Sequence, residues 1–191
     1  MACSNDEKWI NLSTEEVLNT HIFKIYKDRT RCPRTNVEAD FYRFDTGDWV
    51  NVIAVTPENK MVIIKQFRHG SQDIKLEIPG GCIDATDTDP IDAGARELLE
   101  ETGFAGDAGV MIGRVQPNPA LQGNYCYTVL ITNAHKISAV RLEDMEDIET
   151  TLVDMPTLEK LVIEQKLDHG LVINALYFYD LYQRKNCKFE L

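Results

Sequence analysis

The sequence lacks several features that would place it in a specialised class of proteins. No stretch approaches the roughly 20 consecutive apolar residues of a membrane-spanning helix, and the polar N-terminus lacks the apolar segment of a secretory signal. The five cysteines are scattered and form no Cys-x-x-Cys pair, which argues against a disulfide framework and a zinc site. We therefore expect reduced thiols and a cytoplasmic protein.

Positive charge is also scarce. The chain has 20 lysines and arginines against 31 aspartates and glutamates, which gives a formal net charge of −11. Because nucleic acids are bound mainly through cationic contacts to phosphate, this balance argues against a nucleic-acid-binding protein. An enzyme acting on a small anionic substrate is compatible with it, provided that divalent cations reverse the local charge.

The chain is long and apolar enough for one compact domain, with 191 residues of which 43% are hydrophobic. Two β-rich runs, 49–56 and 61–67, flank a Pro57–Lys60 turn and predict a largely buried hairpin. The other expected strands are His21–Tyr26, Phe41–Phe44, 108–115, 125–132 and 148–153, and the last helices are 157–165 and 170–184. This order predicts an α/β fold with a mixed sheet between helices.

A further helix is predicted from Pro90 to Thr102. Asp89 suits its N-cap, and proline suits its first position. Gly103 is a natural C-terminal stop. The short strand before the helix, Glu77–Gly81, ends in two glycines that permit unusual backbone geometry.

Three glutamates of this helix are the clearest chemical signal in the sequence. Glu97, Glu100 and Glu101 lie three and four positions apart, so they share one face and repel one another. A hard divalent cation would relieve the repulsion, because Mg²⁺ takes carboxylate oxygens as ligands and keeps water and substrate phosphates as others. The alternative is a solvated charged face, the usual role of such a run. None of the four histidines has metal-like spacing.

The order of residues around these glutamates resembles the Nudix box: a glycine, a downstream glutamate, then Arg-Glu-aliphatic-x-Glu-Glu-x-Gly-aliphatic. Gly81 matches the opening glycine, and 96–103 match the helical half at every specified position. Phe104 replaces the usual final aliphatic residue. About residues 40–185 resemble the nucleoside-diphosphate-sugar and ADP-ribose pyrophosphatase branch of the Nudix hydrolases.

That resemblance implies a domain organisation and an oligomeric state. We expect a Nudix-type α/β/α sandwich at 41–191 and an N-terminal extension with short strands at 1–40. Related pyrophosphatases are often dimers in which N-terminal strands cross to the partner, so a homodimer is expected. Neither a membrane nor nucleic acid is an expected partner.

The sequence departs from the family pattern in one place, because the loop before the helix is one residue longer. The position of the first box glutamate falls on Thr88 when counted back from Arg96, and on Asp87 when counted forward from Gly81. Three aspartates are candidates to supply the missing carboxylate to Arg96: Asp84, Asp87 and Asp89.

The resemblance also implies the ligands of the metal, which we expect to be Mg²⁺ with Mn²⁺ as an alternative. Glu97 and Glu101 are expected to bind it directly, with Glu100 as a third or bridging ligand. The backbone carbonyl of Gly80 is a further candidate. Arg96 is expected to orient a glutamate rather than to touch substrate.

Other site residues are expected outside the box. The general base of this branch is a glutamate on a later loop, where Glu146 is the best match and Glu143 the reserve; an ordinary exposed acidic loop is the alternative. Arg68 and Glu77 are candidates for substrate binding. Arg68 either contacts a substrate phosphate or pairs with Glu77.

The implied reaction is metal-dependent hydrolysis of the pyrophosphate bond of a nucleoside diphosphate sugar, such as ADP-ribose or GDP-mannose. Its products are a nucleoside monophosphate and a sugar phosphate. Two alternatives stay open: a Nudix hydrolase of another nucleotide (a dinucleotide, a nucleoside triphosphate or capped RNA), and a non-catalytic nucleotide-binding module.

Overall fold

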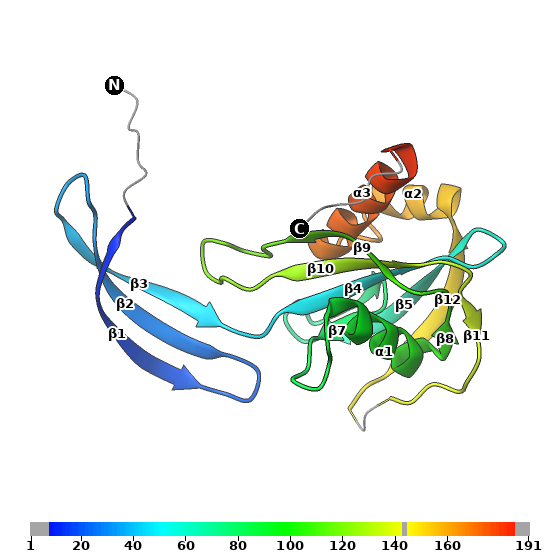
Figure 1. Ribbon diagram of the computed structural model, residues 1–191, viewed down its shortest axis with the longest axis horizontal. Coiled ribbons are helices and arrows are strands. Elements are labelled where there is room, and N and C mark those ends of the chain that lie inside the picture. Colours follow the sequence, from blue (N-terminus) through cyan, green and yellow to red (C-terminus); the bar gives the residue numbers. More distant parts are fainter. Residues whose placement is uncertain (1–7, 143–144, 186–191) are drawn as a thin grey trace. The chain divides into compact units, whose positions relative to one another are not determined.

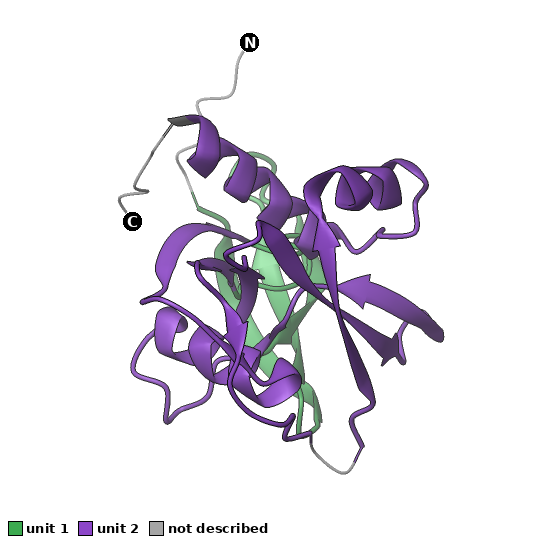
Figure 2. Ribbon diagram, turned by 90° about the vertical axis from the view of Figure 1, so that its right-hand side faces the viewer, with its two compact units in different colours: residues 1–47, 116–124 green, residues 48–115, 125–191 purple. Residues whose placement is uncertain are grey.

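The computed structural model describes residues 8–142 and 145–185 (Figure 1). The chain forms two compact units, shown in different colours in Figure 2. Unit 1 is residues 1–47 with 116–124, and unit 2 is residues 48–115 with 125–191. In the described part of the chain, no helix is both long and apolar enough to span a membrane.

Unit 1 is built on a three-stranded antiparallel sheet in the order β1 (Ile10–Asn19), β2 (Lys24–Arg31) and β3 (Glu38–Asp45). Ion pairs link β2 to β3, among them Arg31 to Glu38 at 2.8 Å. The strand β1 was not expected, because its Ser-Thr-Glu-Glu centre breaks the apolar alternation that identifies a half-buried strand. Within residues 8–47, all of which the structure describes, no side chain is buried.

Unit 2 contains two larger sheets and one short ladder. The first is mixed, with β4 parallel to β10 and its other pairs antiparallel; its order is β7 (Gly80–Cys82), β4 (Trp49–Ala54), β10 (Cys126–Ile131) and β9 (Val110–Val115). The second is antiparallel, in the order β12 (Ile148–Asp154), β5 (Lys60–Arg68) and β6 (Asp73–Glu77). The ladder pairs β8 (Phe104–Ala105) with β11 (His135–Lys136).

The expected pairing of 49–56 with 61–67 in a hairpin is wrong, whereas the expected burial of both runs is confirmed. β4 and β5 meet at a single bridge between Val55 and Met61 and then enter different sheets. Each strand instead has two neighbours from elsewhere in the chain. A long buried apolar run fits a central strand of either arrangement, so the sequence pattern alone does not choose the partner.

Helices cover both faces of the mixed sheet (Figure 1). Side chains alternate along β4, so Val50 and Val52 pack toward α1 (Pro90–Thr102). Ile53 packs on the other face, in the cluster formed with α2 (Met155–Ile163) and α3 (Gly170–Lys185). The expected α/β sandwich with a mixed sheet between helices is confirmed.

The helix α1 begins and ends where the sequence predicts. The Asp89 carboxylate accepts the backbone N–H groups of Ile91 and Asp92 at 2.8 and 2.9 Å. Gly103 adopts the left-handed conformation, with φ of 73°, and its N–H bonds the carbonyl of Leu99. Both ends of the helix are therefore fixed, and with them the positions of its glutamates.

The left-handed turn at the end of α1 gives a test of the fold. In Gly103→Ala, the new Cβ would overlap the carbonyl oxygen of Ser138 as well as strain the backbone. We expect this change to lower the free energy of unfolding by about 2 kcal/mol or more in urea denaturation. Gly123→Ala is the control, because a Cβ there meets nothing within 4 Å; a shift below about 0.5 kcal/mol is expected. Equal effects would contradict the assigned turn.

Candidate active site

Arg96 links the loop before α1 to the glutamates of the helix. Its Nε and Nη2 donate to the two carboxylate oxygens of Asp87, each at 3.0 Å. Its Nη1 donates to Glu97 Oε1 and Glu100 Oε2, again at 3.0 Å, and Nη2 also bonds the Cys82 carbonyl. These partners, Asp87 first, raise the pKa of Arg96 above its ordinary value. The guanidinium therefore fixes two of the predicted metal ligands.

Asp87 is the carboxylate that the lengthened loop supplies to Arg96. Its side chain is 4% exposed, and its Oδ2 also accepts the backbone N–H of Asp84 at 2.7 Å, which closes the loop. The bond from Arg96 holds the pKa of Asp87 below its usual range. The other two aspartates proposed as partners of Arg96 have different positions. Asp84 is 61% exposed and lies 3.7 Å from Arg96, and Asp89 caps the helix.

Glu101 and Glu97 are the glutamates that α1 withdraws from water. Glu101 is 4% exposed, and its Oε2 accepts the backbone N–H of Gly80 at 3.0 Å. Burial raises its pKa to about 8, and the charges of Glu97 and Glu146 add to the shift. Burial likewise raises the pKa of Glu97. A Cβ at Gly81 would overlap the Glu97 carboxylate, so the box glycine is required for this approach.

This donor set fits a hard divalent cation, because carboxylates held out of water favour a bound positive charge. In the part of the chain that the structure describes, however, no three acidic, histidine or cysteine side chains converge as a complete ligand set. The contacts explain this arrangement, since Glu97 and Glu100 both turn an oxygen to Arg96 and Glu101 turns one to Gly80.

Arg68 and Glu77 form the second predicted pair. Nε and Nη2 of Arg68 donate to the two carboxylate oxygens of Glu77, at 2.7 and 2.6 Å. The Glu77 side chain is 4% exposed and that of Arg68 is 43% exposed. This bond is the main cause of a raised pKa at Arg68, to which Glu101 and Glu146 also contribute by their charges. The structure thus shows the pairing that the sequence left open; contact with a phosphate stays a prediction.

Glu146 lies near this cluster, just before β12. Its charge raises the pKa of Glu97 and of Glu101, and that of Arg68. Glu146 is therefore close enough to the box for its charge to act on these three side chains. The reserve candidate, Glu143, lies outside the described residues.

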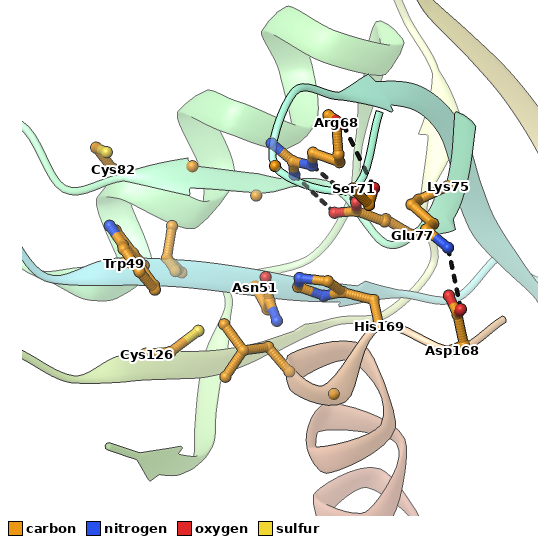
Figure 3. Close-up of a pocket in the computed structure, with 16 residues that line it drawn as sticks. Trp49, Asn51, Arg68, Ser71, Lys75, Glu77, Cys82, Cys126, Asp168 and His169 are labelled. Atoms are coloured by element: carbon orange, nitrogen blue, oxygen red, sulfur yellow. Dashed lines mark hydrogen bonds and ion pairs between the residues drawn. The ribbon is translucent and has the colours of Figure 1, made fainter. Parts of the chain in front are cut away.

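A cavity of about 680 Å³ adjoins the cluster, lined by Arg68, Glu77, Gly80 and Gly81 (Figure 3). Its other walls come largely from residues that sequence reasoning missed: Trp49, Asn51, Ser71, Lys75, Cys82, Cys126, Asp168 and His169. Strand pairing brings several of them together, since Trp49 lies opposite Cys82 on one neighbouring strand and Cys126 on the other. No local motif signals such cross-strand neighbours.

The NUDIX domain family model matches residues 46–166, well over half of the chain. The chain belongs to the Nudix family. It is 27% identical over 179 residues to an ADP-ribose pyrophosphatase of Bacillus subtilis (strain 168), covering 93% of this chain and 95% of that one. A methanol dehydrogenase activator of Bacillus methanolicus is 32% identical over 93 residues, 49% of each chain.

The fold is also shared with a solved structure described as an ADP compounds hydrolase. Its TM-score is 0.84 at 16% identity, with 96% of this chain and 98% of that one covered. Together these likenesses confirm the sequence-based identification as a Nudix pyrophosphohydrolase with the α/β sandwich of that family.

The bond between Asp87 and Arg96 gives a test of the site. Asp87→Ala leaves Arg96 without its bidentate partner, so Glu97 and Glu100 lose their fixed orientation. We expect pyrophosphohydrolase activity to fall by about 10- to 100-fold, the usual effect of removing a group that orients metal ligands. Asp84→Ala is the matched control in the same loop, with an expected change below about twofold. Similar losses in both variants would show that the loop as a whole, not Asp87, matters.

Proposed function

We propose that this protein hydrolyses the pyrophosphate bond of a nucleoside diphosphate sugar, with ADP-ribose as the first candidate and GDP-mannose as another. The observation that carries this proposal is that Glu101 bonds Gly80 and Glu97 lies against Gly81, two glycines that line the cavity together with Arg68. The charge of Glu146 acts on all three side chains. The likeness to an ADP-ribose pyrophosphatase over nearly the whole chain supports the choice of substrate.

Glu97 and Glu101 would hold a Mg²⁺ ion, or Mn²⁺ in its place. Glu100 and the backbone carbonyl of Gly80 would complete the protein ligands. When bound, the ion would neutralise phosphate charge and lower the pKa of a coordinated water. Arg96 positions Glu97 and Glu100 through its hydrogen bonds and does not itself need to reach the substrate.

Arg68 would bind the diphosphate. Glu77 engages its Nε and Nη2 and so fixes the plane of the guanidinium. We assign the third nitrogen, Nη1, to a phosphoryl oxygen of the substrate. Because Glu77 is buried and Arg68 is half exposed, the pair presents its positive end outward.

Glu146 would act as the general base. Its carboxylate would accept the proton of the attacking water. The effect of its charge on Glu97 and Glu101 supports this role, because a base at this position would be close to the metal ligands. A neighbouring segment, residues 143–144, falls outside the described part of the chain, so Glu143 stays the reserve for this role.

The two rival readings lack a comparable observation. A non-catalytic binding module has no use for one buried and one partly buried carboxylate whose pKa values are both raised by burial. A Nudix hydrolase of another nucleotide would share the box but gains no support from the full-length relative. A cytoplasmic location, with reduced thiols, completes the proposal; Cys32, Cys82 and Cys126 are free in the structure.

The test of this function is product analysis with ADP-ribose and Mg²⁺. We expect AMP and ribose 5-phosphate in equal amounts, with no turnover in excess EDTA. Glu97→Gln, Glu101→Gln and Glu146→Gln should each lower kcat by about 100-fold or more, because each removes a charge that the reaction uses. Glu58→Gln, on an exposed turn, is the control and should match the wild type. Equal activity in all the proteins would refute the assignment.

We also propose that the protein is a homodimer formed through unit 1. A three-stranded sheet needs a hydrophobic face in a core to be stable, and no side chain of residues 8–47 is buried in the single chain. Several large apolar side chains of this segment are about half exposed or more: Trp9, Ile10, Val17, Leu18, Val37, Phe41 and Tyr42. Apolar surface of this extent marks an interface, and a second copy would cover it.

Light scattering tests the dimer. The wild type should have twice the chain mass of 21.7 kDa. Phe41→Asp should shift the protein toward the monomer, because the side chain is 48% exposed and its ring packs on Trp9 at 5.6 Å between centroids. Ile163→Asp, which changes an 82% exposed residue of α2, should leave the mass unchanged. A monomeric wild type would overturn the proposal.

A further inference from the structure

The cavity beside the box contains two polar groups that the mechanism does not use. Asn51 lies on the central strand β4, and His169 immediately precedes α3. Both line the cavity, and Figure 3 shows the imidazole directed toward the Asn51 side chain. Asn51 Nδ2 and His169 Nδ1 are buried, and neither has a hydrogen-bond partner among the described residues.

The backbone that carries each of these two side chains is held in place by its neighbours. Asn51 is paired across β4 with Gly80 and Thr128. The carbonyl of His169 accepts the N–H of Ile173 in the first turn of α3. The preceding Asp168 forms an ion pair of 3.0 Å with Lys75, which ties this loop to β6. Both side chains therefore start from fixed backbone positions in the wall of the cavity.

The charged groups of the cavity are already matched to one another. Arg68 is bonded to Glu77, and Lys75 to Asp168. Beside Arg68 Nη1, which we assign to the diphosphate, the unpartnered buried groups that line this cavity are Asn51 Nδ2 and His169 Nδ1. A hydroxyl fits them best, because it can both donate and accept, whichever way the amide is turned and whichever tautomer the imidazole takes.

The position of the cavity next to the predicted metal ligands indicates which part of a substrate would place its hydroxyl groups in the cavity. Gly80 lines it and also donates its N–H to Glu101, so the cavity and the predicted metal ligands share one residue. A diphosphate held by Arg68 and the box glutamates would direct one of its two end groups into the cavity. At the other end of the cavity, the side chains of Trp49, Cys82 and Cys126 form an apolar wall.

We propose that Asn51 and His169 recognise hydroxyl groups of the substrate's sugar and so determine the preference for a nucleoside diphosphate sugar over other esters of the same nucleotide. The inference rests on the proposed function. The two residues lie outside the Nudix box, one on the strand β4 and one in the loop before α3, and the fold brings them to the same cavity.

Two substrates that share a nucleotide test this assignment: ADP-ribose and the β-methyl ester of ADP, which lacks the second sugar. The quantity to compare is the ratio of kcat/KM for ADP-ribose to kcat/KM for the methyl ester. We expect Asn51→Leu and His169→Leu each to lower this ratio by about tenfold, because the hydroxyls lose a partner in a buried site. His169→Gln, which keeps a polar group, should retain more of the ratio. His135→Leu, an exposed histidine outside the cavity, is the control and should keep it unchanged.

Each result of this experiment decides something. A wild type that prefers ADP-ribose, with the preference reduced in both leucine variants, supports the assignment. If both leucine variants keep the wild-type preference, this assignment is overturned while the proposed function stands. The same holds if the variants lose activity equally on the two substrates, because that result would indicate a structural role. Turnover of neither compound by the wild type would overturn the proposed function and this inference with it.

Discussion

The site depends on the contact between one arginine and the carboxylates around it. Arg96 joins Asp87 in the loop, Glu97 and Glu100 in α1, and the carbonyl at the end of β7. Without that positive charge, the acidic side chains of the loop and helix would repel one another and have no fixed order. The arginine fixes the orientation of Glu97 and Glu100, two of the glutamates that we propose as metal ligands.

Two carboxylates of α1 are also shielded from water, Glu101 almost completely and Glu97 in large part, and only Glu97 of the two bonds Arg96. Glu101 is nearly inaccessible and bonded to Gly80, and the Glu97 carboxylate lies so close to Gly81 that a Cβ there would displace it. Burying such groups without a counter-charge costs stability. Burial raises the pKa of both side chains, and a bound cation would reduce this cost.

The sequence predicted the parts of this account that depend on local chemistry. The limits of α1, its caps and the shared face of its glutamates all follow from residue types and helical spacing. The sequence also showed the one-residue insertion in the loop, but three aspartates were candidates to replace the missing carboxylate. Only the fold shows that Asp87 is the one that forms the bidentate bond with Arg96. The strand partners of β4, and the presence of Asn51 and His169 in the lining of one cavity, depend on contacts between segments that are distant in the sequence. No local sequence pattern predicts such contacts.

The central claim is that the glutamates of α1 bind a divalent cation in the folded protein. Electron paramagnetic resonance of Mn²⁺ tests it directly, because the signal of the free ion falls as the ion binds. Titration of the full chain should show saturable binding that Mg²⁺ displaces, and the double variant Glu97→Gln with Glu101→Gln should lose it. Binding of equal affinity in the wild type and this variant would contradict the account.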